Sequence, residues 1–389
     1  MPFVRRTTAI VLSLALAGTA PASATTAALW DHPGYDAEDS HFNPLETGIT
    51  GLTIGRITQK WHVPLRTSTR SCSTFGGPVL AAGRVHVSDQ LGVSAYDAAT
   101  GKTLWRYDWD DPADNETPTL ALSDGLLIVA GGDCNSQSDP DGRLLALDAR
   151  TGLPRWKLRL DNPVHSIVVD KHVIVVSGGS PSDEDLVAAF AVTDGRALWT
   201  RKNALTSEVA ANGTIVVRLP DGTVALSVTD GTELWKRSGS WTAQAASPRS
   251  EYFYATDKSG KLSAIRVVDG HSVWTAAAPS ASSPTFSSAS LSASLSAGSR
   301  IAADWQRIYR VDGKTVEALN TGDGRRAWSI TQTEPGTQPV RAGGLLYAGG
   351  PVLSPDDGTP LGQSWPGTVT VAGGRIHQVD DGVLRTWAP

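Results

Sequence analysis

Short apolar runs recur along most of the chain, and glycine-containing turns separate them. Residues 117–132, "TPTLALSDGLLIVAGG", hold two such runs joined at Asp124-Gly125, and residues 142–160 hold two more joined at Thr151-Gly152. Dipeptides of this kind are typical of tight turns between antiparallel strands. No segment keeps the period of an amphipathic helix. The pattern predicts an all-β protein made of four-stranded antiparallel units.

One phrase marks each unit: an apolar strand, a polar turn with glycine, and a strand that carries tryptophan. "YDAATGKTLW" ends at Trp105 and is followed by "LDARTGLPRW", "AVTDGRALW", "SVTDGTELW", "RVVDGHSVW", "LNTGDGRRAW" and the degenerate "LSPDDGTPLGQSW". The spacing of these tryptophans averages about 45 residues, a period typical of four-stranded propeller blades. The repeat therefore predicts a β-propeller.

The residue types of the phrase have structural explanations. Gly101 permits the positive φ of a tight turn, and Asp97 and Thr100 can accept hydrogen bonds from turn amides. We expect Trp105 and its equivalents to pack on the neighbouring blade, where an indole buries on the order of 200 Å². The predicted docking tryptophans are Trp61, Trp105, Trp156, Trp199, Trp235, Trp274, Trp328 and Trp365.

The two ends of the chain complete the count of blades. Residues 51–63 carry one tryptophan-bearing strand, at Trp61, without partner strands before it, whereas residues 368–389 supply three strands and lack a fourth. Pairing the first strand into the last blade closes the ring and removes exposed edges. We predict eight blades, with seven as the alternative if the Trp365 unit is an insertion.

Composition limits the class of function. Hydrophobic residues make up 40% of the 389 residues and the net charge is −5, which argues against a nucleic-acid binder. Residues 1–24 combine Arg5-Arg6, an apolar run and a small-residue end, as a secretory signal peptide does. We therefore predict one domain over residues 25–389 in a secreted or periplasmic protein, exported by the general or the twin-arginine route. No later stretch is long enough to span a membrane.

The two cysteines fall in loops of one face. Cys72 precedes the first strand of blade 1, and Cys134 lies between the second and third strands of blade 2. In a meander both connections lie on the same side, and an oxidising compartment favours pairing. We predict a Cys72–Cys134 disulfide; two unpaired thiols are the alternative.

Acidic side chains lie near Cys134. Asp133, Asp139 and Asp141 share its loop, and the equivalent loop of the next blade holds Asp183, Glu184 and Asp185. Calcium takes several oxygen ligands, and "DPDG" is similar to part of a calcium loop, so the first three are candidate ligands. A solvated acidic rim is the alternative, because the full spacing of a calcium loop is missing.

The residues that open each inner strand are expected to line the mouth of the channel on the same face. They are Phe75, Glu116, His165, Glu208, Gln244 and Phe286. Aromatic, amide and carboxylate groups in a funnel are suited to binding a ligand. His165 with Glu116 is a candidate acid–base pair; a structural or merely exposed histidine is the alternative. The Ser/Ala-rich residues 277–299 are expected to form a long connection between blades.

"YDAATGKTLW" resembles the tryptophan-docking repeat of the PQQ-like (pyrrolo-quinoline quinone) propellers. Residues 41–61, with Asn43-Pro44-Leu45-Glu46-Thr47, are similar to the entry segment of quinoprotein propellers. The resemblance spans essentially the whole mature chain and implies the fold, but fold does not fix function. Its enzyme branch uses a quinone on the axis, a vicinal disulfide, a stacked tryptophan, Ca²⁺ and an aspartate base.

This chain has no adjacent cysteines, and none of those enzyme residues can be placed on it. It also lacks the lipid-anchoring cysteine of the BamB-type branch. The resemblance therefore implies a cofactor-free, monomeric binding scaffold that presents the Cys72–Cys134 face to a protein, peptide or extracellular ligand. A PQQ-dependent oxidoreductase with Ca²⁺, or a hydrolase or lyase at the channel mouth, is the alternative.

Overall fold

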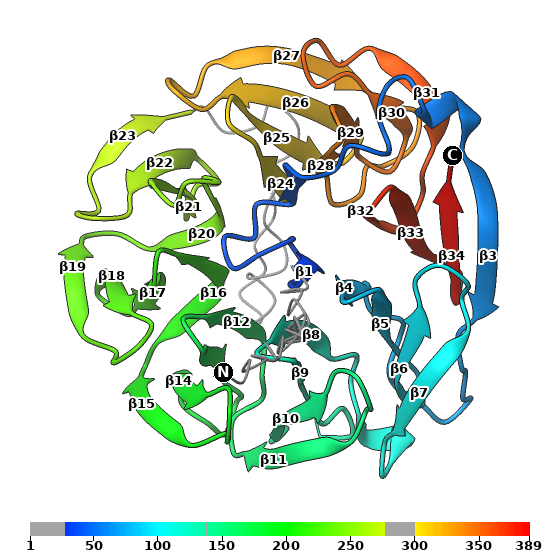
Figure 1. Cartoon of the computed structure of the whole chain (residues 1–389). Coiled ribbons are helices and arrows are strands. Elements are labelled where there is room, and N and C mark those ends of the chain that lie inside the picture. The colour runs from blue at the N-terminus through cyan, green and yellow to red at the C-terminus, as the bar shows by residue number, and fades with distance from the viewer. Residues whose placement is uncertain (1–27, 137, 277–299) are drawn as a thin grey trace, which may run out of the picture.

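The computed structural model describes residues 28–136, 138–276 and 300–389. Eight sheets surround a central axis, each a blade whose first strand is innermost (Figure 1). The predicted eight-bladed propeller is confirmed, and the seven-bladed alternative is wrong because the unit before Trp365 is a complete blade, β28 to β31. The predicted signal peptide and residues 277–299 lie outside the described residues.

In blades 1 to 7 the four strands of the meander run outward in chain order, whereas the outermost strand of blade 8 comes from the N-terminal part of the chain. Blades 1 to 4 contain β4 (Val79–Ala81), β5 (Arg84–Asp89), β6 (Gly92–Asp97), β7 (Thr103–Asp108); β8 (Thr119–Ser123), β9 (Leu126–Gly132), β10 (Gly142–Asp148), β11 (Pro154–Leu160); β12 (Ser166–Asp170), β13 (Val173–Gly178), β14 (Leu186–Ala191), β15 (Ala197–Lys202); and β16 (Leu205–Ala211), β17 (Thr214–Leu219), β18 (Gly222–Ser227), β19 (Glu233–Arg237).

Blades 5 to 8 continue the same meander. They contain β20 (Trp241–Ala246), β21 (Tyr252–Asp257), β22 (Leu262–Arg266), β23 (Ser272–Thr275); β24 (Arg300–Ala303), β25 (Arg307–Asp312), β26 (Thr315–Asn320), β27 (Arg326–Thr331); β28 (Val340–Ala342), β29 (Leu345–Tyr347), β30 (Pro351–Leu353), β31 (Pro360–Ser364); and β32 (Thr368–Ala372), β33 (Arg375–Asp380), β34 (Val383–Ala388), β3 (Thr58–Pro64). Two short 3₁₀ helices are η1 (Ile54–Arg56) and η2 (Pro112–Asp114).

The N-terminal strand β3 closes the ring. It pairs antiparallel with β34, with Thr58 opposite Ala388 and His62 opposite Arg385, and becomes the outermost strand of blade 8. The β1 strand (Ala28–Trp30) adds to the inner edge of blade 1, and β2 (Phe42–Asn43) pairs parallel with β28 of blade 7. Residues 28–64 therefore reach both the axis and the rim of the ring.

The core lies between blades rather than within a blade. Every residue of β13 is buried, whereas the outer strand β11 alternates between exposed and half-buried positions. Ile128 and Leu144 of blade 2 pack in one cluster with Ile167 and Ile174 of blade 3. A strand with neighbours on both faces reads as a continuous apolar run, which explains the runs seen in the sequence.

Seven tryptophans of the outer strands contact the next blade in the same way. Each indole N–H donates to a backbone carbonyl in the turn between the third and fourth strands of that blade. The pairs are Trp61–Ala98 (3.2 Å), Trp105–Ala149 (3.1 Å), Trp156–Val192 (3.0 Å), Trp199–Val228 (2.9 Å), Trp235–Val267 (2.8 Å), Trp274–Thr321 (2.8 Å) and Trp328–Pro355 (2.9 Å).

Trp365 corrects the expectation for the eighth tryptophan. Its ring is 3% exposed and meets Trp387 edge to face, and its Nε1 has no hydrogen-bond partner. The reason is topological. The third and fourth strands of blade 8 come from opposite ends of the chain, so no turn joins them and no turn carbonyl is there to accept the indole proton.

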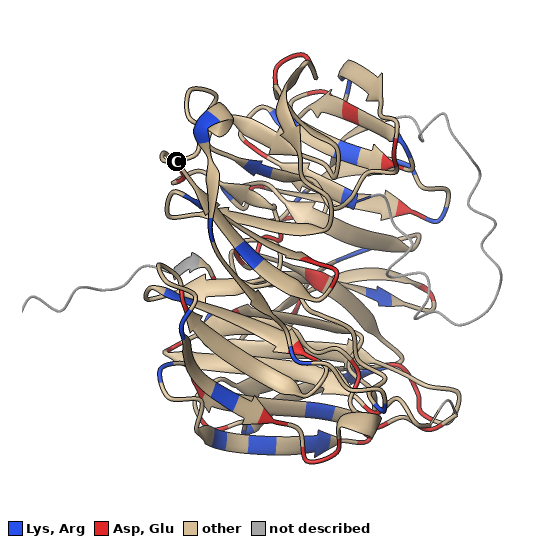
Figure 2. Cartoon of the chain, turned by 90° about the vertical axis from the view of Figure 1, so that its right-hand side faces the viewer, with Lys and Arg blue, Asp and Glu red and all other residues tan. Residues whose placement is uncertain are grey.

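The surface carries mixed charge. Figure 2 shows basic and acidic residues interspersed along the strands and turns of the side in view. Among the described residues, no helix is long and apolar enough to cross a membrane.

Candidate functional site

The two faces of the ring differ in the connections they carry. The disulfide face bears the loops between second and third strands and the connections between blades, including both cysteines. The plugged face bears the turns between first and second strands and between third and fourth strands.

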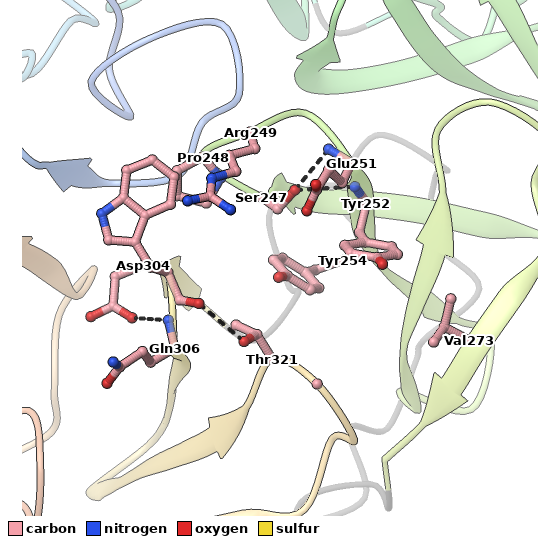
Figure 3. A pocket seen from close by; sticks show the side chains of 12 residues that line it. Ser247, Pro248, Arg249, Glu251, Tyr252, Tyr254, Val273, Asp304, Gln306 and Thr321 are labelled. Carbon is pink, nitrogen blue, oxygen red and sulfur yellow. Dashed lines mark hydrogen bonds between the residues drawn. The ribbon is translucent and has the colours of Figure 1, made fainter.

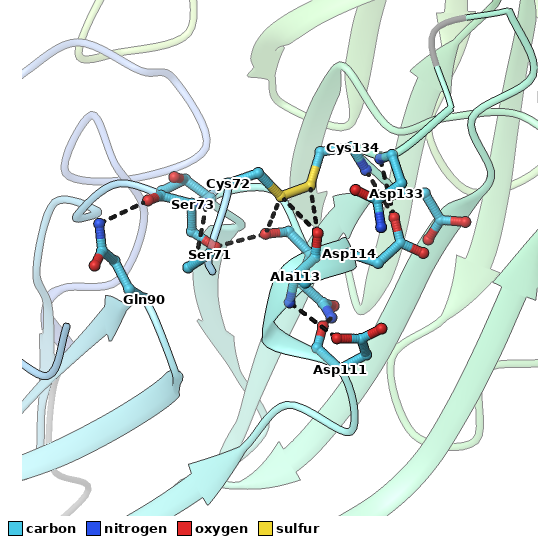
Figure 4. Close-up of a disulfide and its surroundings, with 12 residues drawn as sticks. Ser71, Cys72, Ser73, Gln90, Asp111, Ala113, Asp114, Asp133 and Cys134 are labelled. Carbon is cyan, nitrogen blue, oxygen red and sulfur yellow. Dashed lines mark hydrogen bonds between the residues drawn. A yellow bond between two sulfur atoms is a disulfide. The ribbon is translucent and has the colours of Figure 1, made fainter. Parts of the chain in front are cut away.

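The predicted Cys72–Cys134 disulfide is present, with its Cα atoms 6.5 Å apart (Figure 4). It joins the loop that enters blade 1 to the β9–β10 loop of blade 2, and η2 lies against it. The sulfur of Cys72 is 3.4 Å from the carbonyl oxygen of Asn115. The Asp114 carboxylate accepts hydrogen bonds from the backbone N–H groups of Cys134 and Asn135. The three segments therefore form one fixed patch.

The acidic side chains beside the disulfide are neutralised by arginines. Asp133 pairs with Arg143 at 2.5 Å and with Arg159 at 2.9 Å, and Arg159 also pairs with Asp141 at 2.6 Å. Arg143 binds Asp114 as well, at 3.3 Å. Burial raises the pKa of Asp133, and Arg143 opposes that shift. Two arginines are thus shared among Asp114, Asp133 and Asp141, so these three carboxylates are held in ion pairs rather than left open.

The geometry also bears on the three candidate calcium ligands. Asp133 and Asp141 share Arg159, while Asp139 accepts a hydrogen bond from the Ser182 hydroxyl of the next blade at 2.7 Å. A calcium ion would have to displace these partners. Within the described part of the chain, no group of three or more His, Cys, Asp and Glu side chains is placed to hold a metal ion.

Three of the predicted mouth residues lie on the disulfide face. Glu116 opens blade 2, and burial, with the nearby charge of Asp133, raises its pKa to about 7. His165 opens blade 3, where its Nε2 pairs with the carbonyl oxygen of Gly179 at 2.9 Å. Phe75 lies against Gly382 at the β33–β34 turn. No hydrogen bond joins Glu116 to His165, so the structure does not assemble the candidate acid–base pair.

The other three predicted mouth residues lie elsewhere. Glu208 sits within β16, where the pairing register shifts between Thr206 and Ala210, and it is close to Asp39 rather than at the mouth. Gln244 sits at the register shift of β20, and its amide donates to the Thr256 hydroxyl at 3.2 Å. Phe286 lies outside the described residues. Glu208 and Gln244 lie inside strands that begin at Leu205 and Trp241, and a bulge re-aims a side chain, which the sequence pattern does not reveal.

The segment from Ala28 to Glu46 runs across the plugged face near the axis (Figure 1) and contacts the innermost strand, or its end, in all eight blades. The contacts follow chain order. From blade 1 to blade 8 they are β1 with β4; Asp31 O with Leu122 N (2.8 Å); His32 Nε2 with Val169 O (2.8 Å); Ala37 O with Ala210 N (2.7 Å); Glu38 O with Ala246 N (2.7 Å); Ser40 O with Ala303 N (2.8 Å); His41 O with Arg341 N (2.8 Å); and Asn43 Nδ2 with Val371 O (2.9 Å).

Ionisable groups are buried beneath this segment. Burial raises the pKa values of Asp36, Asp39 and Glu208, and their mutual charges add to the shifts of Asp36 and Asp39. Burial lowers the pKa of His41 to about 3. Burial therefore favours the uncharged forms of these groups. No sequence pattern marks these groups, because the segment has no repeat and binds mainly through its backbone.

A quinone and calcium do not fit the described residues. Pyrroloquinoline quinone is a polycarboxylate, and the buried ionisable groups beside the axis include three carboxyls whose own pKa values are already raised. Arg341, on the inner strand β28 of blade 7, is held by Asp304 at 2.9 Å. The only cysteines form a disulfide across 62 residues, so the vicinal pair of the quinoprotein enzymes is absent. No catalytic step is therefore derived through a quinone.

The fold and its indole-docked turns define an eight-bladed propeller of the PQQ-like class. Two regions of the chain, residues 89–224 and 220–359, match the family model described as outer membrane protein assembly factor BamB. The chain belongs to this family of PQQ-like β-propeller repeat proteins.

Relatives include both enzymes and an assembly factor. Quinohemoprotein alcohol dehydrogenase ADH IIB of Pseudomonas putida is 28% identical over 179 residues, which cover 44% of this chain and 25% of that protein. The chain thus spans about a quarter of that relative's length. The crystal structure of a quinohemoprotein alcohol dehydrogenase from Comamonas testosteroni matches with a TM-score of 0.64 at 14% identity, over 92% of this chain and 80% of that one.

BamB from Moraxella catarrhalis also matches as a solved structure. The TM-score is 0.59 at 18% identity, and the match covers 86% of this chain and 98% of BamB. At these identities both structural matches establish the fold alone.

Proposed function

We propose that this protein is an exported, non-catalytic binding propeller whose disulfide face engages a protein or peptide partner. The observation that carries the proposal is the course of residues 28–46 across the axis, where they contact all eight blades. An enzyme of the quinoprotein kind needs the axis for its cofactor, and here the chain itself occupies one mouth above buried carboxyls.

The disulfide face is suited to binding because its loops are fixed before a partner arrives. The disulfide joins blade 1 to blade 2, and Ser182 joins blade 2 to blade 3 through the backbone of Ser138 and the carboxylate of Asp139. Rigid loops lower the entropy lost on association. The family model adds support, since its description is that of an assembly factor.

The quinoprotein oxidoreductase is the second candidate, and the match to the Pseudomonas putida dehydrogenase favours it. Titrating the purified protein with pyrroloquinoline quinone and Ca²⁺ separates the two functions. We expect neither tryptophan quenching nor dye-linked alcohol oxidation. Saturable binding with dye reduction would contradict the binding-propeller proposal.

A site-specific crosslinker tests the binding face directly. We would place a photoreactive phenylalanine at Asp183 on the disulfide face and, as the matched control, at Thr232 in a turn of the plugged face. Exported proteins of the producing cell should give one discrete adduct from position 183 and none from position 232. Equal adducts from both positions would argue against a dedicated face.

A further inference from the structure

A pocket of about 340 Å³ opens on the plugged face between blades 5 and 6 (Figure 3). Its walls come from the β20–β21 turn and β21 of blade 5, and from the β24–β25 and β26–β27 turns of blade 6. The volume falls at the lower end of the roughly 300–1,000 Å³ typical of small-molecule sites. The pocket is separate from the disulfide face.

Three aromatic side chains line the pocket. Tyr252 and Tyr254 come from β21, and the ring of Tyr254 stacks on Trp274 at 6.2 Å and 25°. Across the blade interface, Trp305 is 49% exposed and meets Phe42 of the N-terminal segment edge to face. Because these packing contacts hold the rings, the walls are formed before a ligand binds.

Several polar groups in the pocket have no hydrogen-bond partner among the described residues. They are the guanidinium of Arg249, which lies over the Trp305 ring at 5.2 Å, the carboxylate of Glu251, the side-chain amide of Gln306 and the two tyrosine hydroxyls. Asp304 differs, because its carboxylate is already used by Arg341, by the hydroxyl of Tyr309 and by the backbone of Gln306. The free groups offer both donors and acceptors.

The charges of the pocket select the ligand class. Arg249 disfavours a cation, Glu251 disfavours an anion, and the remaining free groups are neutral. Aromatic rings beside mixed donors and acceptors suit a ligand with apolar C–H faces and many hydroxyls, each of which can donate and accept. We propose that this pocket binds a neutral saccharide of one or two rings. The proposal is independent of the function assigned to the disulfide face.

The test uses maltose, cellobiose and N,N′-diacetylchitobiose as probes, measured by saturation-transfer NMR and titration calorimetry on the mature protein. We expect at least one of them to bind with a millimolar or lower Kd. Trp305→Ala and Glu251→Gln should each weaken that binding at least tenfold. Leu361→Ala, which removes another exposed apolar side chain on blade 7, should leave it unchanged.

The contrary outcomes are equally definite. The saccharide site is wrong if none of the three sugars binds, or if their binding survives both pocket variants. Binding of choline or citrate in place of sugars, abolished by the same variants, would also overturn it by reassigning the ligand. Far-ultraviolet circular dichroism checks that Trp305→Ala is folded, and if it is not, Glu251→Gln and Gln306→Ala carry the test.

Discussion

The indole N–H of Trp61 donates to the carbonyl oxygen of Ala98 at 3.2 Å, across the seam where the ring closes. Trp61 belongs to the N-terminal strand of blade 8, and Ala98 to the turn between β6 and β7 of blade 1. The contact is the same as at the six interfaces between consecutive blades 1 to 7. The seam is therefore packed like an ordinary blade interface.

The turn glycine beneath each indole should be intolerant of a side chain. At Gly101 the φ angle is +73°, and an added Cβ would lie 2.7 Å from the Trp61 ring. Gly101→Ala should lower the free energy of unfolding by about 2–4 kcal/mol, through backbone strain and overpacking together. Chemical denaturation measures the loss.

Gly125→Ala is the matched control. Gly125 has nearly the same φ, +75°, but nothing lies within 4 Å of its added Cβ. Backbone strain alone should lower the free energy of unfolding of Gly125→Ala by about 1 kcal/mol. Equal losses in the two variants would show that contact with the indole is unimportant.

The atypical tryptophan should respond differently from the docked ones. Trp328→Phe removes the hydrogen bond to Pro355, whereas Trp365→Phe removes an indole N–H that has no partner. Both changes reduce side-chain volume by the same amount, so their difference isolates the hydrogen bond. We expect Trp328→Phe to be more destabilising by about 1 kcal/mol. A larger loss for Trp365→Phe in thermal unfolding would refute this.

Glu116 should make the protein less stable as the pH rises. Its pKa is about 7 in the folded protein, raised first by burial and then by Asp133, against an ordinary value of 4.5. Between these two values the unfolded chain releases the proton while the folded protein retains it, so stability falls as the pH increases and is constant again above about 7.

Glu116→Gln removes this dependence. The difference in free energy of unfolding between Glu116→Gln and the wild type should shift in favour of the variant by on the order of 1–3 kcal/mol from pH 4.5 to pH 8. Glu334→Gln, at an exposed carboxylate, should show no such gain. Urea denaturation of the three proteins at both pH values measures it, and parallel curves for the wild type and Glu116→Gln would contradict the assignment.

The disulfide should contribute to global stability. It closes a loop with a sequence separation of 62 residues, and the chain-entropy model gives about 4 kcal/mol for that length. The double variant Cys72→Ala/Cys134→Ala should unfold at correspondingly lower denaturant. Reduction of the wild type should give the same shift. A midpoint unchanged by either treatment would show that the patch is held by its ion pairs alone.

The fold could be predicted because the residues that determine blade geometry lie close together in the sequence. Each turn needs its glycine, as at Gly101, and each interface its indole, as at Trp105, so the repeat period and the blade number could be predicted. The disulfide could be predicted too, because a meander places alternate connections on one face. Trp365 was misjudged because its environment depends on which blade the chain ends share.

The candidate site could be predicted less well, since it depends on contacts between distant segments. Glu208 and Gln244 lie at register shifts, which re-aim a side chain and are not marked by the residue pattern. The N-terminal segment binds through backbone groups, which any sequence supplies. The pocket at Trp305 arises only where two blades and Phe42 meet, and no repeat position marks it.

The course of the N-terminal segment also bears on how the chain folds. Residues made first, such as Asn43, contact residues made last, such as Val371, across a sequence separation of 328. In most repeat proteins each unit touches only its neighbours, so folding can begin anywhere and spread. Here every blade also contacts the same N-terminal segment. Contacts of such high sequence separation slow folding. We expect the eight blades to become stable together, after synthesis is complete, rather than one after another on the ribosome.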